Sequence, residues 1–188
     1  MEKEYSVVTF STPPDTFKKL YREMPLSPVK CERGSFSNRK GVFVMWTRLE
    51  NGKYTEKWGF NAKLSAHPFT LKTVERVVKC CFPEGTTEKL CITMYFFRHE
   101  EPVGALQLHQ DGAAYVSTFP IDFQGFDGGD GHIQTSDGTD VIVSFSKPGI
   151  GYIANDVKCK HGATALTTNS SKPPIRDVFI ITVAKDNE

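Results

Sequence analysis

Two residues near the middle of the chain have the types and the spacing of neighbouring metal ligands. His109 and Asp111 are two positions apart in the run Leu108-His-Gln-Asp-Gly112. On an extended segment, alternate side chains point to the same face, so the imidazole and the carboxylate are expected side by side. The His-x-Asp pattern is short and also arises by chance, so a metal site requires further ligands elsewhere in the chain.

A third candidate ligand is His161, in the run His161-Gly-Ala-Thr164. A rolled-up sheet could return it to the position of His109 and Asp111. Two histidines and one carboxylate on one face of an octahedron leave three adjacent positions open, as non-haem Fe(II) oxygenases require. Zinc fits less well, because it usually prefers four-coordinate sites.

Arg176 has the chemistry of an anion-binding residue. It is the only basic residue of the apolar run 176–183, and it shares strand parity with Val178, Ile180 and Thr182. A lone arginine facing the interior needs an anion, and a carboxylate bound through two hydrogen bonds is its natural partner. An internal salt bridge or an outward-facing edge position is the alternative, because charged residues are mostly exposed.

The elements that must position these residues are mainly β-strands. From residue 90 onward, segments rich in Val, Ile, Phe and Tyr alternate with clusters of Gly, Asp, Asn and Pro. Short strands with frequent turns indicate a sandwich or barrel. The glycine-rich run 125–131 is expected to be a tight turn rather than a calcium loop. The expected strands are 90–98, 104–109, 113–121, 140–145, 149–154, 157–161, 163–168 and 176–184.

Two helices are predicted before residue 90. The first begins at Thr12-Pro-Pro-Asp15, where Thr12 can cap it and proline is tolerated in the first turn, and Pro25 ends it. Apolar residues at helical spacing from Leu71 to Cys81 indicate the second helix, and Pro83 ends it. Helices followed by strands predict helices packed on one outer face of the β-structure.

A hairpin and a loop are predicted between these helices. Asn51-Gly52 separates two β-type runs, 41–49 and 53–60, which is a strong hairpin signal. The polar residues 30–40 indicate a loop. A chain of 188 residues fits one domain over 1–188, with 1–89 supporting the β-core of 90–184.

Composition excludes several classes of function. The net charge of +1 gives no basis for binding nucleic acid or an anionic membrane. No apolar run approaches the roughly 20 residues that span a bilayer, and the polar start is unlike a signal peptide. We therefore expect a cytoplasmic protein. The cysteines show no zinc-type spacing and are expected to be reduced and mostly buried: Cys31, Cys80, Cys81, Cys91 and Cys159.

In this order, the His-x-Asp pair, the distal histidine and the arginine resemble the Fe(II)/2-oxoglutarate-dependent dioxygenases. The motifs resemble more specifically the small branch that contains the bacterial L-isoleucine dioxygenase. The resemblance covers about residues 90–184, and it implies a mainly β (α+β) fold, the double-stranded β-helix or jelly roll. The motifs that carry it are Leu108-His-Gln-Asp-Gly112, Gly128-Gly-Asp130, His161-Gly-Ala-Thr164 and Arg176-Asp-Val-Phe-Ile-Ile-Thr182.

The resemblance also implies a set of roles. His109, Asp111 and His161 would bind Fe(II), Arg176 would hold the distal carboxylate of 2-oxoglutarate, and O₂ would be the oxidant. No catalytic side chain is implied beyond the metal centre. The halogenating relatives have a small residue in place of Asp111, so hydroxylation is the expected reaction.

Two residues on the strand before the motif are further candidates. Tyr95 is expected to contact 2-oxoglutarate, and Arg98 is expected to contact the substrate. A core position for Tyr95 and a surface position for Arg98 are the alternatives.

The expected function is hydroxylation of a small molecule, with a free amino acid as the first candidate. A protein or peptide side chain is the alternative substrate within the same enzyme class. A non-enzymatic jelly-roll module that binds metal is the alternative outside that class.

Overall fold

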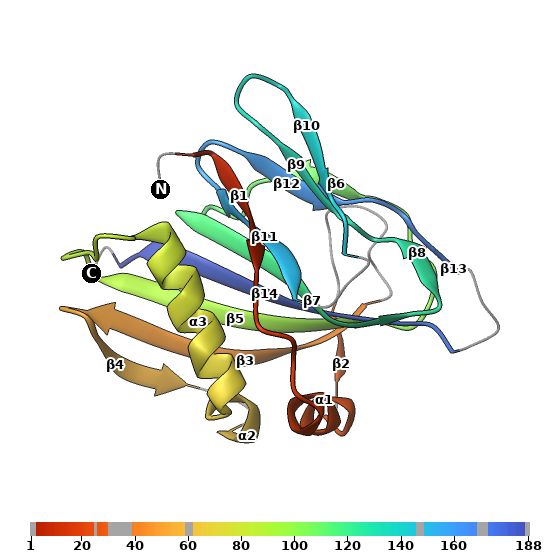
Figure 1. The fold of residues 1–188 in the computed structure, drawn as a ribbon, viewed down its shortest axis with the longest axis horizontal. Helices are drawn as coiled ribbons and strands as arrows, with labels where there is room; N and C mark the ends of the chain where they lie inside the picture. Colours follow the sequence, from red (N-terminus) through yellow and green to blue (C-terminus); the bar gives the residue numbers. More distant parts are fainter. Residues whose placement is uncertain are drawn as a thin grey trace.

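Two β-sheets face each other, and helices cover the outer face of the larger sheet (Figure 1). The computed structural model describes residues 3–24, 26–29, 39–58, 62–145, 149–168 and 173–186. The elements in chain order are β1 (Tyr5–Thr9), α1 (Asp15–Arg22), β2 (Ser27–Val29), β3 (Arg39–Glu50), β4 (Lys53–Trp58), α2 (Ala62–Ser65), α3 (Pro68–Cys81), β5 (Leu90–His99), β6 (Leu106–His109), β7 (Tyr115–Gln124), β8 (Phe126–Gly128), β9 (Gly131–Gln134), β10 (Asp140–Val143), β11 (Ile150–Asn155), β12 (Lys160–Ala163), β13 (Leu166–Thr168) and β14 (Ile175–Lys185).

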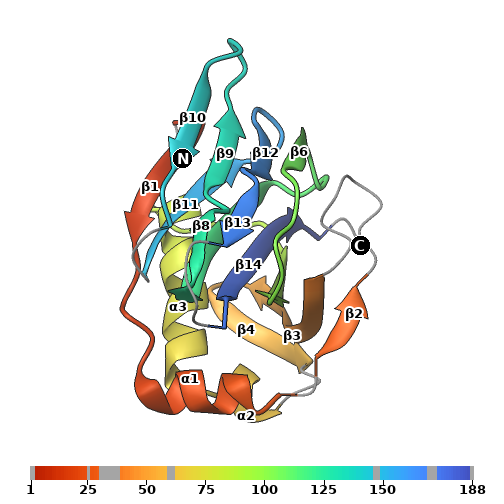
Figure 2. The ribbon, with the colours of Figure 1, turned by 90° about the vertical axis from the view of Figure 1, so that its right-hand side faces the viewer.

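Both sheets are antiparallel. The larger has the order β1-β11-β7-β14-β5-β3-β2, with β4 paired to β3, and the smaller has the order β10-β9-β12-β6. Strands β8 and β13 form a separate pair. Figure 2 shows the smaller sheet at the top, above β14 and its neighbours. The predicted fold, a mainly β double-stranded β-helix with helices on one outer face, is confirmed.

Strands β5 and β14 separate the helix-side core from the interior between the sheets. Their side chains alternate, as the pleat requires. On one face, fully buried residues pack with the helices in the main hydrophobic core: Met94, Phe96, Phe179, Ile181 and Val183. On the other face, alternate residues line a cavity between the sheets: Thr93, Tyr95, Phe97, Val178, Ile180 and Thr182.

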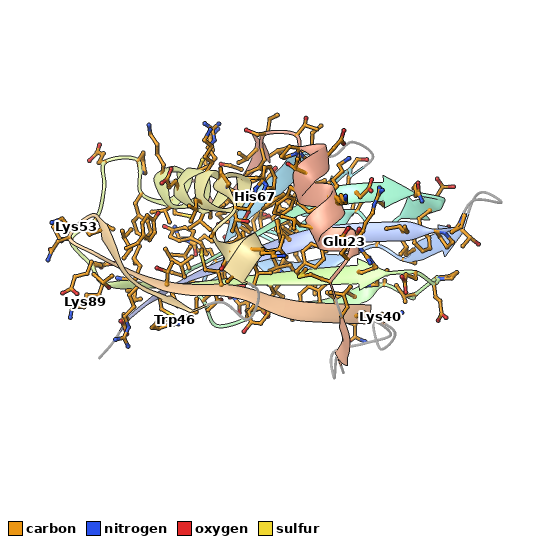
Figure 3. All side chains as sticks on the ribbon, turned by 90° about the horizontal axis from the view of Figure 1, so that it is seen from below. Glu23, Lys40, Trp46, Lys53, His67 and Lys89 are labelled. Atoms are coloured by element: carbon orange, nitrogen blue, oxygen red, sulfur yellow. The ribbon has the colours of Figure 1, made fainter. Side chains whose placement is uncertain are left out.

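Figure 3 shows the helices on one face of the larger sheet. This face is turned away from the smaller sheet (Figure 2). Phe17 of α1 is fully buried and packs against Phe179 of β14, with ring centroids 5.4 Å apart. The helix α3 begins after His67, whose Nδ1 accepts a hydrogen bond from the Phe69 N–H at 3.1 Å. His67 is therefore a helix cap. The cap predicted for Thr12 is wrong, because α1 follows Pro14 with no side-chain cap.

The predicted hairpin is confirmed. Strands β3 and β4 pair across Asn51 and Gly52, whose φ values of 49° and 73° are those of a tight two-residue turn that glycine and asparagine favour. Of the predicted loop 30–40, residues 30–38 lie outside the described residues, and the last two positions belong to β3.

Two sequence predictions of local structure need correction. The run 125–131, predicted to be a tight turn, contains β8 and the start of β9. Gly128 at the end of β8 and Gly129 after it have φ values of 74° and 66°, which allow the backbone to turn sharply between the two short strands. The strand β6 ends at His109, which leaves Asp111 in the loop that follows.

No helix within the described parts of the chain is long and apolar enough to span a bilayer. Within these parts, Cys80, Cys81, Cys91 and Cys159 are free thiols.

A buried ion pair joins β5 to β14 on the helix side. The Arg98 Nε donates to Asp177 Oδ1 at 2.8 Å, and its guanidinium lies 4.9 Å from the Tyr21 ring centroid. The Arg98 and Asp177 side chains are 9% and 0% exposed. Burial raises the pKa of Asp177 to about 6, although Arg98 beside it acts in the opposite direction. Arg98 is therefore a structural cation in this position.

We expect Arg98→Leu to lower the free energy of unfolding by about 3–5 kcal/mol, because it leaves the buried Asp177 without its counter-ion. Chemical denaturation of both proteins measures this difference. The matched control is Arg22→Leu, which breaks a 2.6 Å pair with Asp122 but removes a side chain that is 55% exposed. Its cost should stay below about 1 kcal/mol. Equal costs for the two variants would contradict the structural role of Arg98.

Candidate active site

The two candidate histidine ligands face each other across neighbouring strands of the smaller sheet. In the antiparallel pairing of β6 and β12, His109 is the direct partner of His161. Their ring centroids are 4.5 Å apart. Residues that are 52 positions apart in the sequence are thus brought together by strand register alone.

Asp111 lies between the two imidazoles. Its Oδ1 is 3.4 Å from His109 Nε2, and its Oδ2 is 3.5 Å from His161 Nε2. The three candidate ligand atoms all lie within 4.8 Å of one another. The predicted proximity of His109 and Asp111 is observed, although Asp111 lies in the loop after β6 and not on the same strand.

Hydrogen bonds orient the ligand atoms of these side chains. The His109 Nδ1 donates to the Gln107 carbonyl oxygen at 2.7 Å, because a carbonyl can only accept. That bond turns Nε2 of His109 toward Asp111, which is how histidine ligands of metals are commonly held.

The electrostatics of the triad favour a cation. Hydrogen-bonding contacts with His109, the larger effect, and with His161 hold the pKa of the Asp111 carboxyl well below its usual range, so this group is ionised. For His161, burial acts to lower the pKa, but the carboxylates of Asp111 and Asp156 raise it to about 9. Without metal, a proton on His161 therefore takes the place that a metal ion would occupy.

Arg176 lies at the buried end of the same cavity. Its side chain is 3% exposed, and burial lowers its pKa to about 10, so it remains a cation at neutral pH. One terminal nitrogen donates to the Gly129 carbonyl at 2.6 Å, and the other lies 3.4 Å from His99 Nδ1. Its Nε has no hydrogen-bond partner among the described residues. A buried cation with an orphaned donor calls for an anionic ligand.

The Gly128-Gly-Asp130 motif shapes the wall around Arg176. A Cβ on Gly129 would lie 2.7 Å from Arg176 Nε, so only glycine allows this backbone to pass so close. Asp130 connects the neighbouring segments: its N–H donates to Thr164 Oγ1 at 3.0 Å, and its Oδ1 accepts from the Phe145 N–H at 2.8 Å. The Gly128-Gly-Asp130 motif thus lies against the arginine and supplies no candidate metal ligand.

One cavity of about 600 Å³ is lined by His109, Asp111, His161, Arg176 and Tyr95 together. The ring of Tyr95 is 38% exposed and stacks on Phe97, with centroids 6.2 Å apart.

Arg98 is not among the residues that line this cavity. It lies three positions from Tyr95 on the same strand, and strand alternation sends the two side chains to opposite faces. Its pairing with Asp177 does not favour the predicted contact with a substrate.

Sequence reasoning missed His99 and Asp156. His99 shares strand parity with Tyr95 and Phe97 and is paired in register with Arg176, so parity could have indicated it. Asp156 is the other missed residue, and its Oδ1 lies 3.2 Å from His161 Nε2. No local signal marks it, since its hydrogen-bond donors, the N–H groups of Asp111 and Ala113, lie far from it in the sequence.

The residues present fit iron and 2-oxoglutarate. The imidazoles of His109 and His161 and the carboxylate of Asp111 are a donor set for Fe(II) that leaves coordination positions open. The orphaned donor of Arg176, in the same cavity, fits the distal carboxylate of 2-oxoglutarate.

A family model described as 2OG-Fe dioxygenase matches residues 91–182, which include the triad and Arg176. This match identifies the β-core of the chain as that of an Fe(II)- and 2-oxoglutarate-dependent oxygenase. Enzymes of this superfamily use Fe(II), 2-oxoglutarate and O₂, in agreement with the donor set and the arginine. The match favours an enzyme over the non-enzymatic metal-binding module. No curated protein matches the chain.

Solved structures show the same fold at low sequence identity. IDO from Bacillus thuringiensis is 18% identical, with a TM-score of 0.67 over 79% of this chain and 75% of that one. The Fe(II)/(alpha)ketoglutarate-dependent dioxygenase TqaL is 11% identical, with a TM-score of 0.73 over 97% of this chain and 83% of that one. A prolyl hydroxylase from Trichoplax adhaerens, solved with a peptide of hypoxia inducible factor, is 9% identical, with a TM-score of 0.67 over 98% and 84%.

We expect metal affinity to rise with pH. A metal ion binds the neutral imidazole, and the pKa of His161 in the metal-free protein is about 9, so below this pH each binding event displaces a proton. The affinity for Ni²⁺ should increase about tenfold per pH unit from pH 6.5 to 8.5. Calorimetric titration in buffers of different ionisation enthalpy measures the proton release. Binding that is independent of pH over this range would contradict this protonation state.

We expect Gly129→Ala to weaken 2-oxoglutarate binding while Ni²⁺ affinity stays unchanged, because the new methyl group displaces the Arg176 side chain. Titration of the Ni²⁺-loaded protein with 2-oxoglutarate measures the effect. Gly138→Ala is the matched control: φ is +85° there, and a Cβ meets nothing within 4 Å. Both variants carry backbone strain of about 1 kcal/mol, so a loss specific to Gly129→Ala reports the crowding of Arg176 and of Leu166, whose Cδ1 lies 2.6 Å from the added Cβ.

Proposed function

We propose that the chain is a hydroxylase in which His109, Asp111 and His161 hold Fe(II) and Arg176 binds the distal carboxylate of 2-oxoglutarate. The observation that supports this most directly is that the His-Asp-His triad and a buried arginine with an orphaned donor line one cavity. When bound, iron and 2-oxoglutarate supply the oxidation of a substrate C–H bond by O₂, with release of succinate and CO₂.

The residues of the chain bind the reactants and orient them relative to one another. Arg176 fixes one end of 2-oxoglutarate, so its other end is directed along the cavity toward the triad. The Asp111 carboxylate would take the coordination position that a halide needs, which favours hydroxylation. The face formed by Tyr95, Phe97 and Ile180 provides an apolar surface on which a substrate can lie close to the triad.

A free amino acid or a related small molecule is the first substrate class proposed. The sequence motifs of the isoleucine-dioxygenase-like branch support this choice. The fold similarity to IDO from Bacillus thuringiensis is in keeping with it.

A peptide side chain is the second candidate, and one observation favours it. Among the described residues lining the cavity, the basic groups are Arg176 and three histidines, His99, His109 and His161. Once 2-oxoglutarate occupies Arg176 and iron occupies the triad, these residues offer no guanidinium or ammonium for an α-carboxylate. An uncharged side chain presented by a peptide avoids burying an unmatched charge.

The proposed activity is tested by loading the protein with Fe(II) and 2-oxoglutarate without oxygen, then admitting air in the presence of substrate panels. We expect succinate and a product heavier by one oxygen atom. Turnover in an amino-acid panel alone, or in a peptide panel alone, separates the two substrate classes. Absence of succinate in both panels and in a cell lysate would contradict the proposal.

Two variants connect that activity to the proposed residues. Asp111→Ala should abolish metal binding and turnover, because it removes the one carboxylate of the triad. Arg176→Gln should keep metal binding but weaken 2-oxoglutarate binding by about 10²-fold or more, since a charged hydrogen-bonded pair in a buried site is lost. Metal analysis and 2-oxoglutarate titration measure the two steps separately. Full metal content in Asp111→Ala would show that the ligand assignment is wrong.

A further inference from the structure

The loop that carries Asp111 is held by a residue outside the triad. Because β6 ends at His109, the N–H groups of Asp111 and Ala113 have no place in the strand ladder. Both donate to one oxygen, Oδ2 of Asp156, at 2.9 and 3.0 Å. The Asp156 side chain is fully buried and stands in the turn after β11.

Further hydrogen bonds join the same two segments. The Asp156 N–H donates to the Ala114 carbonyl at 3.1 Å. In return, Gln110 Nε2 donates to the carbonyls of Asp156 and Val157 at 2.6 and 3.0 Å. We call this set of contacts the Asp156 clamp: the Asp156 carboxylate and backbone, the Gln110 side chain, and the backbone of residues 111, 113, 114 and 157.

The clamp also reaches the distal histidine. While Oδ2 of Asp156 accepts the two backbone N–H groups, its Oδ1 lies 3.2 Å from His161 Nε2. One buried carboxylate therefore contacts both the loop of Asp111 and the ring of His161.

We propose that Asp156 is a positioning residue, which sets the orientation of Asp111 toward His161 and so raises the metal affinity of the triad. The proposal rests on the proposed metal-binding function of the triad. A ligand on an unconstrained loop must be ordered when metal binds, and that entropy cost reduces the affinity. Ordering by other residues matters here, because Gly112 beside Asp111 has a φ of 81° and open space around it: a Cβ placed on it would meet nothing within 4 Å. The clamp orders the loop before metal arrives.

The geometry predicts that Asp156 acts through hydrogen bonding and not as a fourth ligand. The two N–H groups need an acceptor oxygen, which an asparagine side chain also offers. Asp156→Asn should therefore preserve most of the function of the clamp, and Asp156→Ala should remove it.

The experiment measures Co²⁺ affinity and the Co²⁺ absorption spectrum in the full chain, together with amide hydrogen exchange without metal. Asp156→Ala should weaken Co²⁺ binding by about 10–100-fold and accelerate exchange at Asp111 and Ala113. Asp156→Asn should stay much closer to the unchanged protein in affinity and show the same spectrum. Thermal unfolding confirms that each variant is folded, and Gln110→Ala, which removes a side chain from the other end of the clamp, should show a smaller loss of affinity.

The matched control is Asn155→Ala. Asn155 precedes Asp156, and the hydrogen bonds of its Oδ1, which accepts from Val157 and Lys158 at 3.1 and 3.2 Å, stay within the same turn. Its Co²⁺ affinity should be that of the unchanged protein.

Two results would overturn the proposal. The first is a folded Asp156→Ala protein with unchanged affinity and unchanged exchange at Asp111 and Ala113. The second is an equal loss of affinity in the Asn and Ala variants with an altered Co²⁺ spectrum, which would make Asp156 a ligand. If the unchanged protein binds no metal, the proposed function fails. The exchange measurement still tests the clamp in that case, because protection at the two amides either depends on Asp156 or does not.

Discussion

The antiparallel register between β6 and β12 is the constraint on which the site depends. It places His109 opposite His161, and a shift of one residue would turn one of these side chains to the other face of the sheet. The register is stabilised on the far side of β12 by β9, where the backbone of Gly162 pairs with His132. A Cβ on Gly162 would lie 2.5 Å from the Leu106 carbonyl, so glycine is needed for β6 to approach.

The larger sheet supplies the opposite wall, and its two faces have different chemistry. Arg176 and its alternate neighbours on β14 face the cavity, while Asp177 and its alternate neighbours face the helices. Of these two adjacent residues, Arg176 thus lines the cavity and Asp177 lies in the helix-side core. The cation between the sheets is left with an orphaned donor, whereas the cation on the helix side, Arg98, is matched by a carboxylate. This contrast distinguishes the arginine for which we propose an anionic ligand from the structural one.

The parts of the site that follow from residue spacing could be predicted from the sequence. Strand parity predicted that Arg176 faces the interior, where it lies. The order of the motifs predicted that His161 lies near His109 and Asp111, as observed. The same parity rule, applied to β5, predicts that Arg98 points to the opposite face from Tyr95 and that His99 points to the same face as Tyr95. The Asp156 clamp could not be predicted, because it joins a turn to a loop through tertiary hydrogen bonds that leave no periodic pattern. The strands β8 and β9 were missed because their glycines indicate a turn.

The pairing of β5 with both β14 and β3 has a consequence for how this enzyme could be diversified. Thr93, Tyr95 and Phe97 project into the cavity from a backbone whose ladder is completed on both sides. Their side chains can therefore be exchanged without breaking a strand hydrogen bond, and the metal-binding side, carried by the other sheet, has no part in that ladder. The cavity face of β5 and the proposed metal ligands thus lie on different sheets, which makes the aromatic face of β5 the natural target for library-based changes of specificity.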